Sequence, residues 1–299
     1  MLTRRRFIAI SAAVFAPSMA MPETPNLHVE TGIALGATVT LRLYHSDAPR
    51  IAAMAMEEIR RLEAIFSFYL PDSALSRLNR DGFLAAPPFE LLDCLTLAGA
   101  VCRASGGRFD PTIQPLWHAE ARMLEIGRSL THAQRTELMA HVGWDGVTLA
   151  SDAITLRPGM ALTLNGIAQG YIADRVAALL ADNDLSRALI DTGEMIALPD
   201  GSWPVQLAGG GKLTLQNRAL ATSAPRGMTF GGDGVTSHIF DPATGRPVLS
   251  RWRSMTVSAS SAAVADALST AACLFDNKAD AVALCEAYPG AVLESAVLL

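Results

Sequence analysis

The chain has 299 residues, of which 24 are Lys or Arg and 29 are Asp or Glu, so its net charge is −5 at pH 7. A negatively charged chain is poorly suited to nucleic acid or to an anionic membrane surface, because both carry the same sign of charge. The negative charge of any polyanionic ligand must therefore be compensated locally at its binding site, for example by a metal ion or by backbone N–H groups. The length allows one large domain or two lobes with an ample core.

The first twenty residues, Met1 to Ala20, have the order of regions that is typical of an export signal. Three arginines precede the apolar run Ile8–Phe15, and small residues follow it up to Ala20. A membrane anchor is the alternative, but this run is too short for a bilayer of roughly 30 Å. The Thr-Arg-Arg-Arg-Phe-Ile string also fits the twin-arginine class of signals. We therefore expect a periplasmic mature protein of residues 21–299 with no membrane span.

The front of the predicted mature chain is rich in helix patterns. Gly32 to Leu43 has the alternation of a strand, after which Pro49 and apolar residues at helical spacing predict a helix over about 51–66. A second helix is expected from Pro88 to Ala104. Thr131 opens a capping box that predicts a shorter helix. These elements indicate a helix-richer lobe that extends to about residue 142.

Strand patterns dominate after that point. Val147–Ala150 and Ala153–Leu156 predict a hairpin, Ala161–Leu164 is another strand candidate, and a helix is expected from Tyr171 to Leu180. The later expected elements are strands at Ala188–Asp191, Val205–Leu207, Leu213–Leu215, Ala219–Thr222 and Met255–Ala259, helices at Ser261–Leu274 and Ala279–Glu286, and an apolar tail. Bunched strands with helices between them predict an α+β fold, in which mixed or antiparallel sheets are flanked by helices.

The four cysteines, at positions 94, 102, 273 and 285, support neither a disulfide framework nor a zinc site. Cys94 and Cys102 are expected on one helix, where eight residues correspond to roughly 12 Å of rise, too far for a bridge. We expect buried thiols.

One segment with chemical potential is a glycine-bearing turn between an expected strand and an expected helix. Leu162 to Tyr171 carries Gly166 and Gly170, which allow a tight turn or the close approach of a ligand. Backbone N–H groups and the helix N-terminus would then point at one spot, which suits a phosphate. Such joints are common in proteins without phosphate ligands, so this turn alone is a weak signal.

A second segment places three oxygen-bearing side chains on one helix face. Asp266, Ser269 and Thr270 are spaced i, i+3 and i+4. An oxygen-only set suits Mg²⁺ rather than a soft metal, although an exposed polar stripe is an equally good reading of the spacing. The flanking alanines favour burial, and a buried carboxylate needs a partner.

A third segment, Thr236 to Pro247, contains His238 beside an Asp-Pro and a Gly-Arg-Pro turn. Histidine can titrate near neutral pH and act as a general base. A lone histidine is more often structural, and Asp241 can simply cap the turn.

Taken in order, these segments resemble the FAD:protein FMN transferases, the ApbE family, over nearly all of residues 30–299. The blocks that carry the resemblance are Leu35–Thr38, Phe66–Tyr69 with Asp72–Asn79, Gly107–Leu116, the glycine turn, Ser237–Gly245 and Asp266–Thr270. The resemblance implies a two-lobed ApbE-like fold with an FAD cleft between the lobes.

The resemblance also implies a role for each matching position. Residues implied to contact FAD are Leu35, Tyr69, Asn79, Phe109, Asp110, Pro111, Thr163, Gln169 and Ile239, with Tyr69 stacked on the flavin. Residues implied to hold Mg²⁺ are Asp266, Ser269, Thr270 and the backbone carbonyl of Gly166. His238 and Asp266 are the expected catalytic residues.

The implied reaction is Mg²⁺-dependent cleavage of FAD, with FMN attached through a phosphoester to a Thr or Ser of an exported partner and AMP released. The alternatives are an FAD pyrophosphatase and a non-enzymatic FAD-binding protein. Most family members have an acid where this chain has Thr163 and a lysine where it has Gln169, which puts a lysine-dependent mechanism in doubt. The sequences of Leu164–Gly170 and Ile190–Glu194 are similar to those of the NosX-like branch of the family, which is associated with nitrous-oxide respiration. The resemblance implies that the partner of this protein is a NosR-like membrane redox protein.

Overall fold

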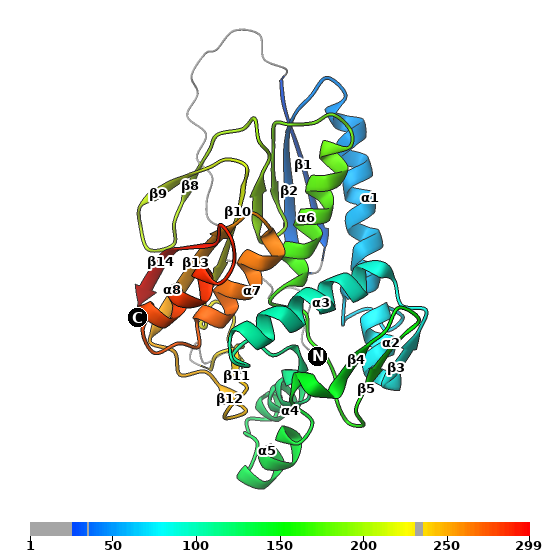
Figure 1. The fold of residues 1–299 in the computed structure, drawn as a ribbon, viewed down its shortest axis with the longest axis vertical. Helices are drawn as coiled ribbons and strands as arrows, with labels where there is room; N and C mark the ends of the chain where they lie inside the picture. Colours follow the sequence, from blue (N-terminus) through cyan, green and yellow to red (C-terminus); the bar gives the residue numbers. More distant parts are fainter. Residues whose placement is uncertain (1–25, 35, 231–235) are drawn as a thin grey trace.

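The computed structural model describes residues 26–34, 36–230 and 236–299 (Figure 1). The predicted export signal and the predicted FAD contact Leu35 lie outside this part of the chain. Within it, no helix combines the length and the apolar character that a membrane crossing requires.

The fold is built on a seven-stranded sheet in the order β1-β2-β6-β7-β10-β13-β14, whose neighbouring strands run antiparallel. Its strands are β1 (Leu27–Ala34), β2 (Ala37–Tyr44), β6 (Ala188–Asp191), β7 (Met195–Ala197), β10 (Arg218–Ser223), β13 (Trp252–Ala259) and β14 (Val292–Leu298). The register pairs Leu41 with Ile190, and both side chains are buried under the helices. Since side chains alternate along a strand, Leu189 faces the opposite side of the sheet.

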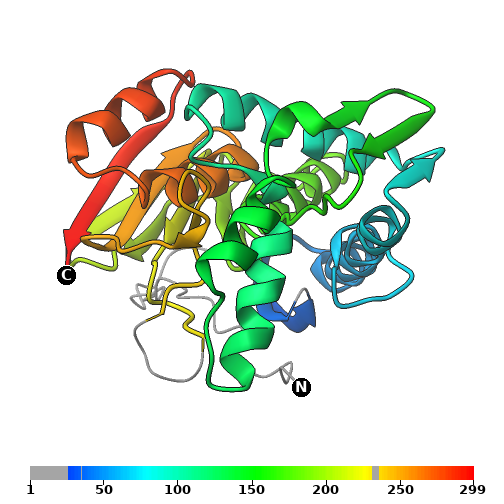
Figure 2. The same cartoon turned by 90° about the horizontal axis from the view of Figure 1, so that it is seen from below.

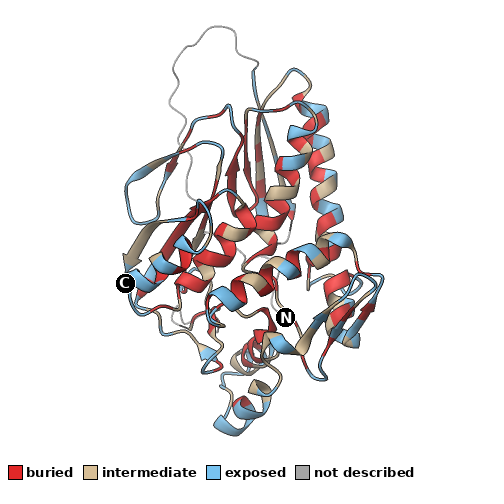
Figure 3. Cartoon of the chain, in the orientation of Figure 1, coloured by how far each residue is buried: buried red, intermediate tan, exposed pale blue. Residues whose placement is uncertain are grey.

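Helices cover one face of this sheet, and a hairpin packs on the other (Figures 1 and 3). The covering helices are α1 (Ala48–Phe66), α6 (Ala168–Ala181), α7 (Ala262–Ala272) and α8 (Lys278–Glu286), and α3 (Phe89–Ala104) packs on α1 and α7. The hairpin consists of β8 (Trp203–Gln206) and β9 (Lys212–Leu215). On that side Trp203 and Val205 cluster with Leu189 and Leu220. The sheet therefore has apolar contacts on both faces.

Smaller elements complete the molecule at the end near α3 (Figures 1 and 2). They are α2 (Ala74–Asp81), the three-stranded sheet of β3 (Phe83–Ala85), β5 (Ala153–Leu156) and β4 (Val147–Leu149), the short helices η1 (Pro111–Ile113) and η2 (Trp144–Gly146), α4 (Gln114–Glu125), α5 (His132–Met139), β11 (Phe240–Asp241) and β12 (Arg246–Pro247). Arg135 of α5 forms a buried ion pair with Glu120 of α4 and donates to the carbonyl of Gly245. Through these two contacts, Arg135 connects α4 and α5 to the turn between β11 and β12.

The predicted α+β fold with antiparallel sheets is confirmed, as is the capping box at Thr131. The four cysteines are free and buried, as expected. The prediction of one strand over 32–43 is wrong, because the chain reverses near Gly36, where φ is 78°, and forms β1 and β2. The apolar tail forms the edge strand β14.

The expected strand Ala161–Leu164 is also wrong, because its backbone groups are bonded elsewhere than in a ladder. The Asn79 side chain donates to the Leu162 carbonyl at 2.8 Å and accepts from the Leu162 N–H at 2.7 Å. The Thr163 N–H donates to the Pro111 carbonyl at 2.8 Å. The division into lobes near 142 stays a prediction. The strands β1 and β2 belong to the central sheet together with the later strands.

Candidate active site

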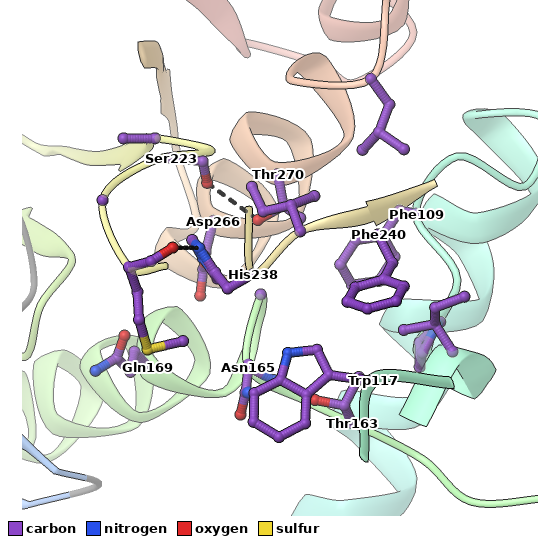
Figure 4. A pocket seen from close by; sticks show the side chains of 18 of the residues that line it. Phe109, Trp117, Thr163, Asn165, Gln169, Ser223, His238, Phe240, Asp266 and Thr270 are labelled. Atoms are coloured by element: carbon purple, nitrogen blue, oxygen red, sulfur yellow. Dashed lines mark hydrogen bonds between the residues drawn. The ribbon is translucent and has the colours of Figure 1, made fainter. Parts of the chain in front are cut away.

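A pocket of about 1220 Å³, its open mouth included, lies between the glycine turn, α7, the end of β10 and β11 (Figure 4). The residues that line it are Ala37, Arg108, Phe109, Asp110, Pro111, Ile113, Trp117, Thr163, Asn165, Gly166, Gln169, Gly193, Glu194, Thr222, Ser223, Ala224, Gly227, Met228, His238, Ile239, Phe240, Pro242, Asp266, Thr270 and Leu274. Most residues predicted to contact FAD or Mg²⁺ are therefore brought together here, although they come from segments far apart in the sequence.

The glycine turn lies against α7 with no room for a side chain. A Cβ on Gly166 would lie 2.8 Å from Thr270 Oγ1, and one on Gly170 would overlap the carbonyl of Ala262. Gly170 N–H also donates to Asp266 Oδ2 at 3.3 Å. The two glycines thus permit the contact that brings the turn to the polar face of α7.

The start of α7 is held by a carboxylate from α6. Asp174 accepts hydrogen bonds from Ser261 Oγ at 2.7 Å, Ala262 N–H at 2.7 Å and Ala263 N–H at 2.9 Å. A negative charge at a helix N-terminus satisfies its free N–H groups and interacts favourably with the helix dipole. Asp174 therefore fixes the position of the helix that carries Asp266.

Three hydroxyl groups meet beside that helix. Ser223 Oγ lies 2.7 Å from Ser269 Oγ and 3.0 Å from Thr270 Oγ1. Ser269 Oγ also donates to the Asp266 carbonyl at 3.0 Å. Ser269 is fully buried and does not line the pocket, whereas Ser223 and Thr270 do. The predicted role of Ser269 as a metal ligand stays a prediction.

Two buried carboxyl groups border the same part of the pocket. Burial, and then the nearby charge of Asp174, raises the pKa of Asp266 to about 8, although the Gly170 N–H opposes this shift. Burial also raises the pKa of Glu194 well above its usual value, and the Thr222 N–H donates to Glu194 at 3.2 Å. A cation bound beside them would stabilise the ionised form of both carboxyl groups.

The donor set around Asp266 fits Mg²⁺. Among the described residues, no lysine or arginine forms an ion pair with Asp266. The same part of the chain contains no cluster of three or more His, Cys, Asp or Glu side chains that could hold a metal ion. A buried carboxylate with the hydroxyls of Thr270 and Ser223 beside it offers the hard oxygen ligands that Mg²⁺ prefers.

His238 presents one ring nitrogen to a fixed acceptor. Its Nδ1 lies 2.9 Å from the carbonyl oxygen of Met228, which can only accept, so Nδ1 carries the hydrogen. Burial lowers the pKa of His238 below 6.5, although the carbonyls of Met228 and Pro225 favour the charged form. A neutral ring with its hydrogen on Nδ1 has its lone pair on Nε2, the atom that a general base would use.

The remaining FAD candidates in the pocket are Phe109, Asp110, Pro111, Thr163, Gln169 and Ile239. Asp110 caps η1 by accepting from the N–H and the hydroxyl of Thr112, at 2.9 and 2.7 Å, and burial raises its pKa. A Cβ on Gly193 would lie 3.0 Å from Gln169 Nε2, so the uncharged Gln169 amide lies close to this glycine.

Aromatic side chains occupy the other side of the site. Tyr69, Phe66 and Phe68 line a second, smaller pocket that shares Asn165 and Gln169 with the first. Ring centroids link Tyr69 to Phe68 at 3.9 Å, Phe68 to Trp117 at 6.1 Å, Trp117 to Phe230 at 5.1 Å and Phe230 to Phe240 at 6.2 Å. Asn79 lines neither pocket, since its amide is bonded to Leu162.

The sequence interpretation missed Arg108, Trp117, Glu194 and Ser223 as pocket residues. Ser223 directly follows the expected strand Ala219–Thr222, and polar residues at strand ends often serve sites, so that signal was present. Nothing in the sequence marks Trp117 or Glu194 as facing the same space.

Comparison with known proteins gives a consistent result. The ApbE family model matches residues 35–293. A relative from Vibrio cholerae named FAD:protein FMN transferase is 29% identical over 272 residues, which span 80% of this chain and 79% of the relative. The apo crystal structure of flavinyl transferase ApbE from Pseudomonas stutzeri has a TM-score of 0.79 at 23% identity, covering 94% of this chain and 96% of that one. The ApbE protein of Thermotoga maritima has a TM-score of 0.78 at 25% identity, covering 86% and 90%. Because the family match spans most of the chain and the fold agrees, the chain belongs to the ApbE family.

Proposed function

We propose that this protein is an FAD:protein FMN transferase, which attaches FMN through a phosphoester bond to a Thr or Ser of a partner protein and releases AMP. The observation that carries this proposal is the common pocket of His238 and Asp266, a base candidate and a metal-ligand candidate beside the aromatic residues. Membership of a family whose relatives bear this name supports the same activity.

The reaction joins the acceptor hydroxyl oxygen to the phosphorus on the FMN side of FAD and breaks the bond between that phosphorus and the oxygen that leaves with AMP. His238 Nε2 would take the proton of the attacking hydroxyl, because Nδ1 is occupied by the Met228 carbonyl. The lowered pKa of His238 keeps the ring neutral at pH 7.

Asp266 and Thr270, with the Gly166 carbonyl and Ser269, would hold Mg²⁺. When bound, the ion neutralises pyrophosphate charge as phosphoryl transfer requires. The close contact of Gly166 with Thr270 and the bond from Gly170 to Asp266 hold these oxygen atoms in place before any ligand binds. Tyr69 and Phe68 would hold the flavin ring in the smaller pocket.

The proposal extends to the setting of the reaction. The leader pattern of residues 1–20 supports export to the periplasm by the twin-arginine route, so FAD and the acceptor must both be available there. The sequences of Leu164–Gly170 and Ile190–Glu194 support assignment of this protein to the NosX-like branch. Its acceptor would then be the exported domain of a NosR-like membrane redox protein.

The test combines residues 21–299, FAD, Mg²⁺ and such an acceptor domain. We expect fluorescent flavin to migrate with the denatured acceptor in a gel, AMP to appear in equal amount, and both to stop when the Mg²⁺ is chelated. An acceptor whose Thr and Ser candidates are replaced by Ala is the control.

Two outcomes would contradict the proposal. AMP released at the same rate without acceptor would identify a pyrophosphatase. FAD that binds equally well with chelator, with no AMP released under any condition, would identify a non-enzymatic FAD-binding protein.

A further inference from the structure

Arg108 stands out in the lining of the main pocket by its charge. Among the described residues that line it, Asp110, Glu194 and Asp266 are acidic, Gln169 is neutral, and Arg108 is the one arginine or lysine. A ligand with two phosphate groups therefore meets a single permanently positive side chain there.

The backbone that presents Arg108 is a tight turn at the end of α3. Gly106 and Gly107 have φ angles of 61° and 78°, which are strained for other residues. Gly107 N–H donates to the Cys102 carbonyl at 2.8 Å, and this bond ends the helix and brings Arg108 to the pocket mouth.

The side chain of Arg108 is also held in place. Its guanidinium lies 4.3 Å from the ring centroid of Phe275, and Nη1 donates to the Ser105 carbonyl at 3.4 Å. Phe275 is buried, and its backbone carbonyl accepts from Trp252 Nε1 at 2.7 Å. A guanidinium has five N–H groups and one is used in this bond, so others are free to bind phosphate oxygens in a two-pronged manner.

The position of Arg108 indicates which half of the ligand it meets. The small aromatic pocket joins the main pocket at Asn165 and Gln169 and does not include Arg108. Along α7, Gly170, which follows Gln169, contacts Ala262 at the start of the helix and donates to Asp266. The Arg108 guanidinium instead lies over Phe275, just past the end of α7, so Asp266 and Thr270 lie between the two ends. With the flavin at the aromatic end, the AMP half lies toward Arg108.

We infer that Arg108 binds the phosphate of the AMP half of FAD, and the phosphate of AMP itself before it leaves. This inference rests on the proposed function, since it assigns the two ends of the pocket to the two halves of FAD. It makes Arg108 a substrate-binding residue and gives the acidic pocket a second source of positive charge besides Mg²⁺.

The test measures binding of AMP and of adenosine by calorimetry to the mature protein and to Arg108→Gln. Loss of a charge-assisted hydrogen bond predicts an AMP dissociation constant raised about tenfold, with adenosine binding unchanged. Arg103→Gln is the matched control, because Arg103 is an exposed arginine of the same helix end that does not line the pocket. The KM for FAD should rise in Arg108→Gln and stay constant in Arg103→Gln.

Unchanged AMP affinity in Arg108→Gln would overturn the inference, as would an equal loss for AMP and adenosine or the lack of AMP binding by the unaltered protein. A separate result bears on the proposed function. If the unaltered protein transfers no FMN to any acceptor, that function fails, whereas normal transfer with Arg108-independent AMP affinity removes only the role of Arg108.

Discussion

Two regions of the site are built in different ways. The α6–α7 floor, which consists of Gly166, Gly170, Asp174, Asp266 and Thr270, is held by hydrogen bonds and by backbone contacts that leave no space for an added methyl group. The aromatic wall consists of Phe68, Tyr69, Trp117 and Phe240, with the buried Phe230 packed against Trp117 and Phe240, and its ring contacts lie between 3.9 and 6.2 Å.

We infer from this difference that the floor sets the rate of the reaction and the wall sets the affinity for FAD. Phosphoryl transfer needs fixed charges and oxygen atoms, and the floor provides them in a single arrangement. Ring stacking tolerates small displacements, so the wall can bind a flavin without defining the reacting atoms. Substitutions in the floor should therefore lower kcat, whereas substitutions in the wall should raise KM.

The largest effect is expected at Asp266. Asp266→Asn removes the charged ligand candidate while keeping the size of the side chain, and we expect FMN transfer to fall by at least about a thousandfold. The fold should be retained, because the buried carboxyl already has a pKa raised to about 8 and Asn avoids burying that charge. In-gel flavin fluorescence measures transfer, with exposed Asp182→Asn as the control. Normal flavinylation by Asp266→Asn would remove the metal assignment.

His238 lines the same pocket as the floor and should affect the rate alone. His238→Gln is expected to lower kcat about a hundredfold with little change in FAD affinity, as for loss of a general base. The pKa of His238 is lowered from 6.5 by burial, so its base form persists to lower pH than usual, and the loss of rate that is due to His238 should occur below pH 6.5. An unchanged rate in the variant would return His238 to a structural role.

Gly170 tests whether the floor is as rigid as its contacts indicate. Gly170→Ala would push a methyl group against the Ala262 carbonyl, and overpacking of this kind lowers the free energy of unfolding by about 1–3 kcal/mol. Thermal or urea unfolding measures the loss. Ala178→Ser, on the exposed face of the same helix, should change stability by less than about 0.5 kcal/mol. Equal stability of the two variants would show that α6 and α7 can separate at little cost.

Much of this floor could be predicted from the sequence because its signals are local. The spacing of Asp266 and Thr270 on a helix, and the glycines just before α6 and in its first turn, follow from helix periodicity and turn chemistry. The bond between Gly170 and Asp266 joins residues 96 positions apart, and a single sequence does not indicate which glycine meets which helix.

The errors lie where tertiary contacts replace local patterns. Ala161–Leu164 reads as a strand, yet Asn79 and Pro111 bond its backbone in place of a neighbouring strand. The same bonds explain why Asn79, implied to contact FAD, does not line the pocket. Trp117 was missed because an aromatic residue in a helix is usually core, and only the fold brings its ring to the pocket.

The smallest effect is expected in the aromatic wall. Tyr69 is 37% exposed, its ring centroid is 3.9 Å from that of Phe68, and it lines the smaller pocket. Loss of one stacking partner corresponds to roughly 0.5–1.5 kcal/mol, so Tyr69→Ala should raise the KM for FAD by up to about tenfold and leave kcat nearly unchanged. Tyr69→Phe keeps the ring and should behave as the unaltered protein does, and exposed Phe89→Ala, outside both pockets, controls for a general loss of an aromatic residue. Steady-state transfer at varied FAD measures both constants. If Tyr69→Ala lowers kcat as strongly as His238→Gln does, the wall also positions the reacting phosphate. The inference that the floor sets kcat and the wall sets KM is then wrong.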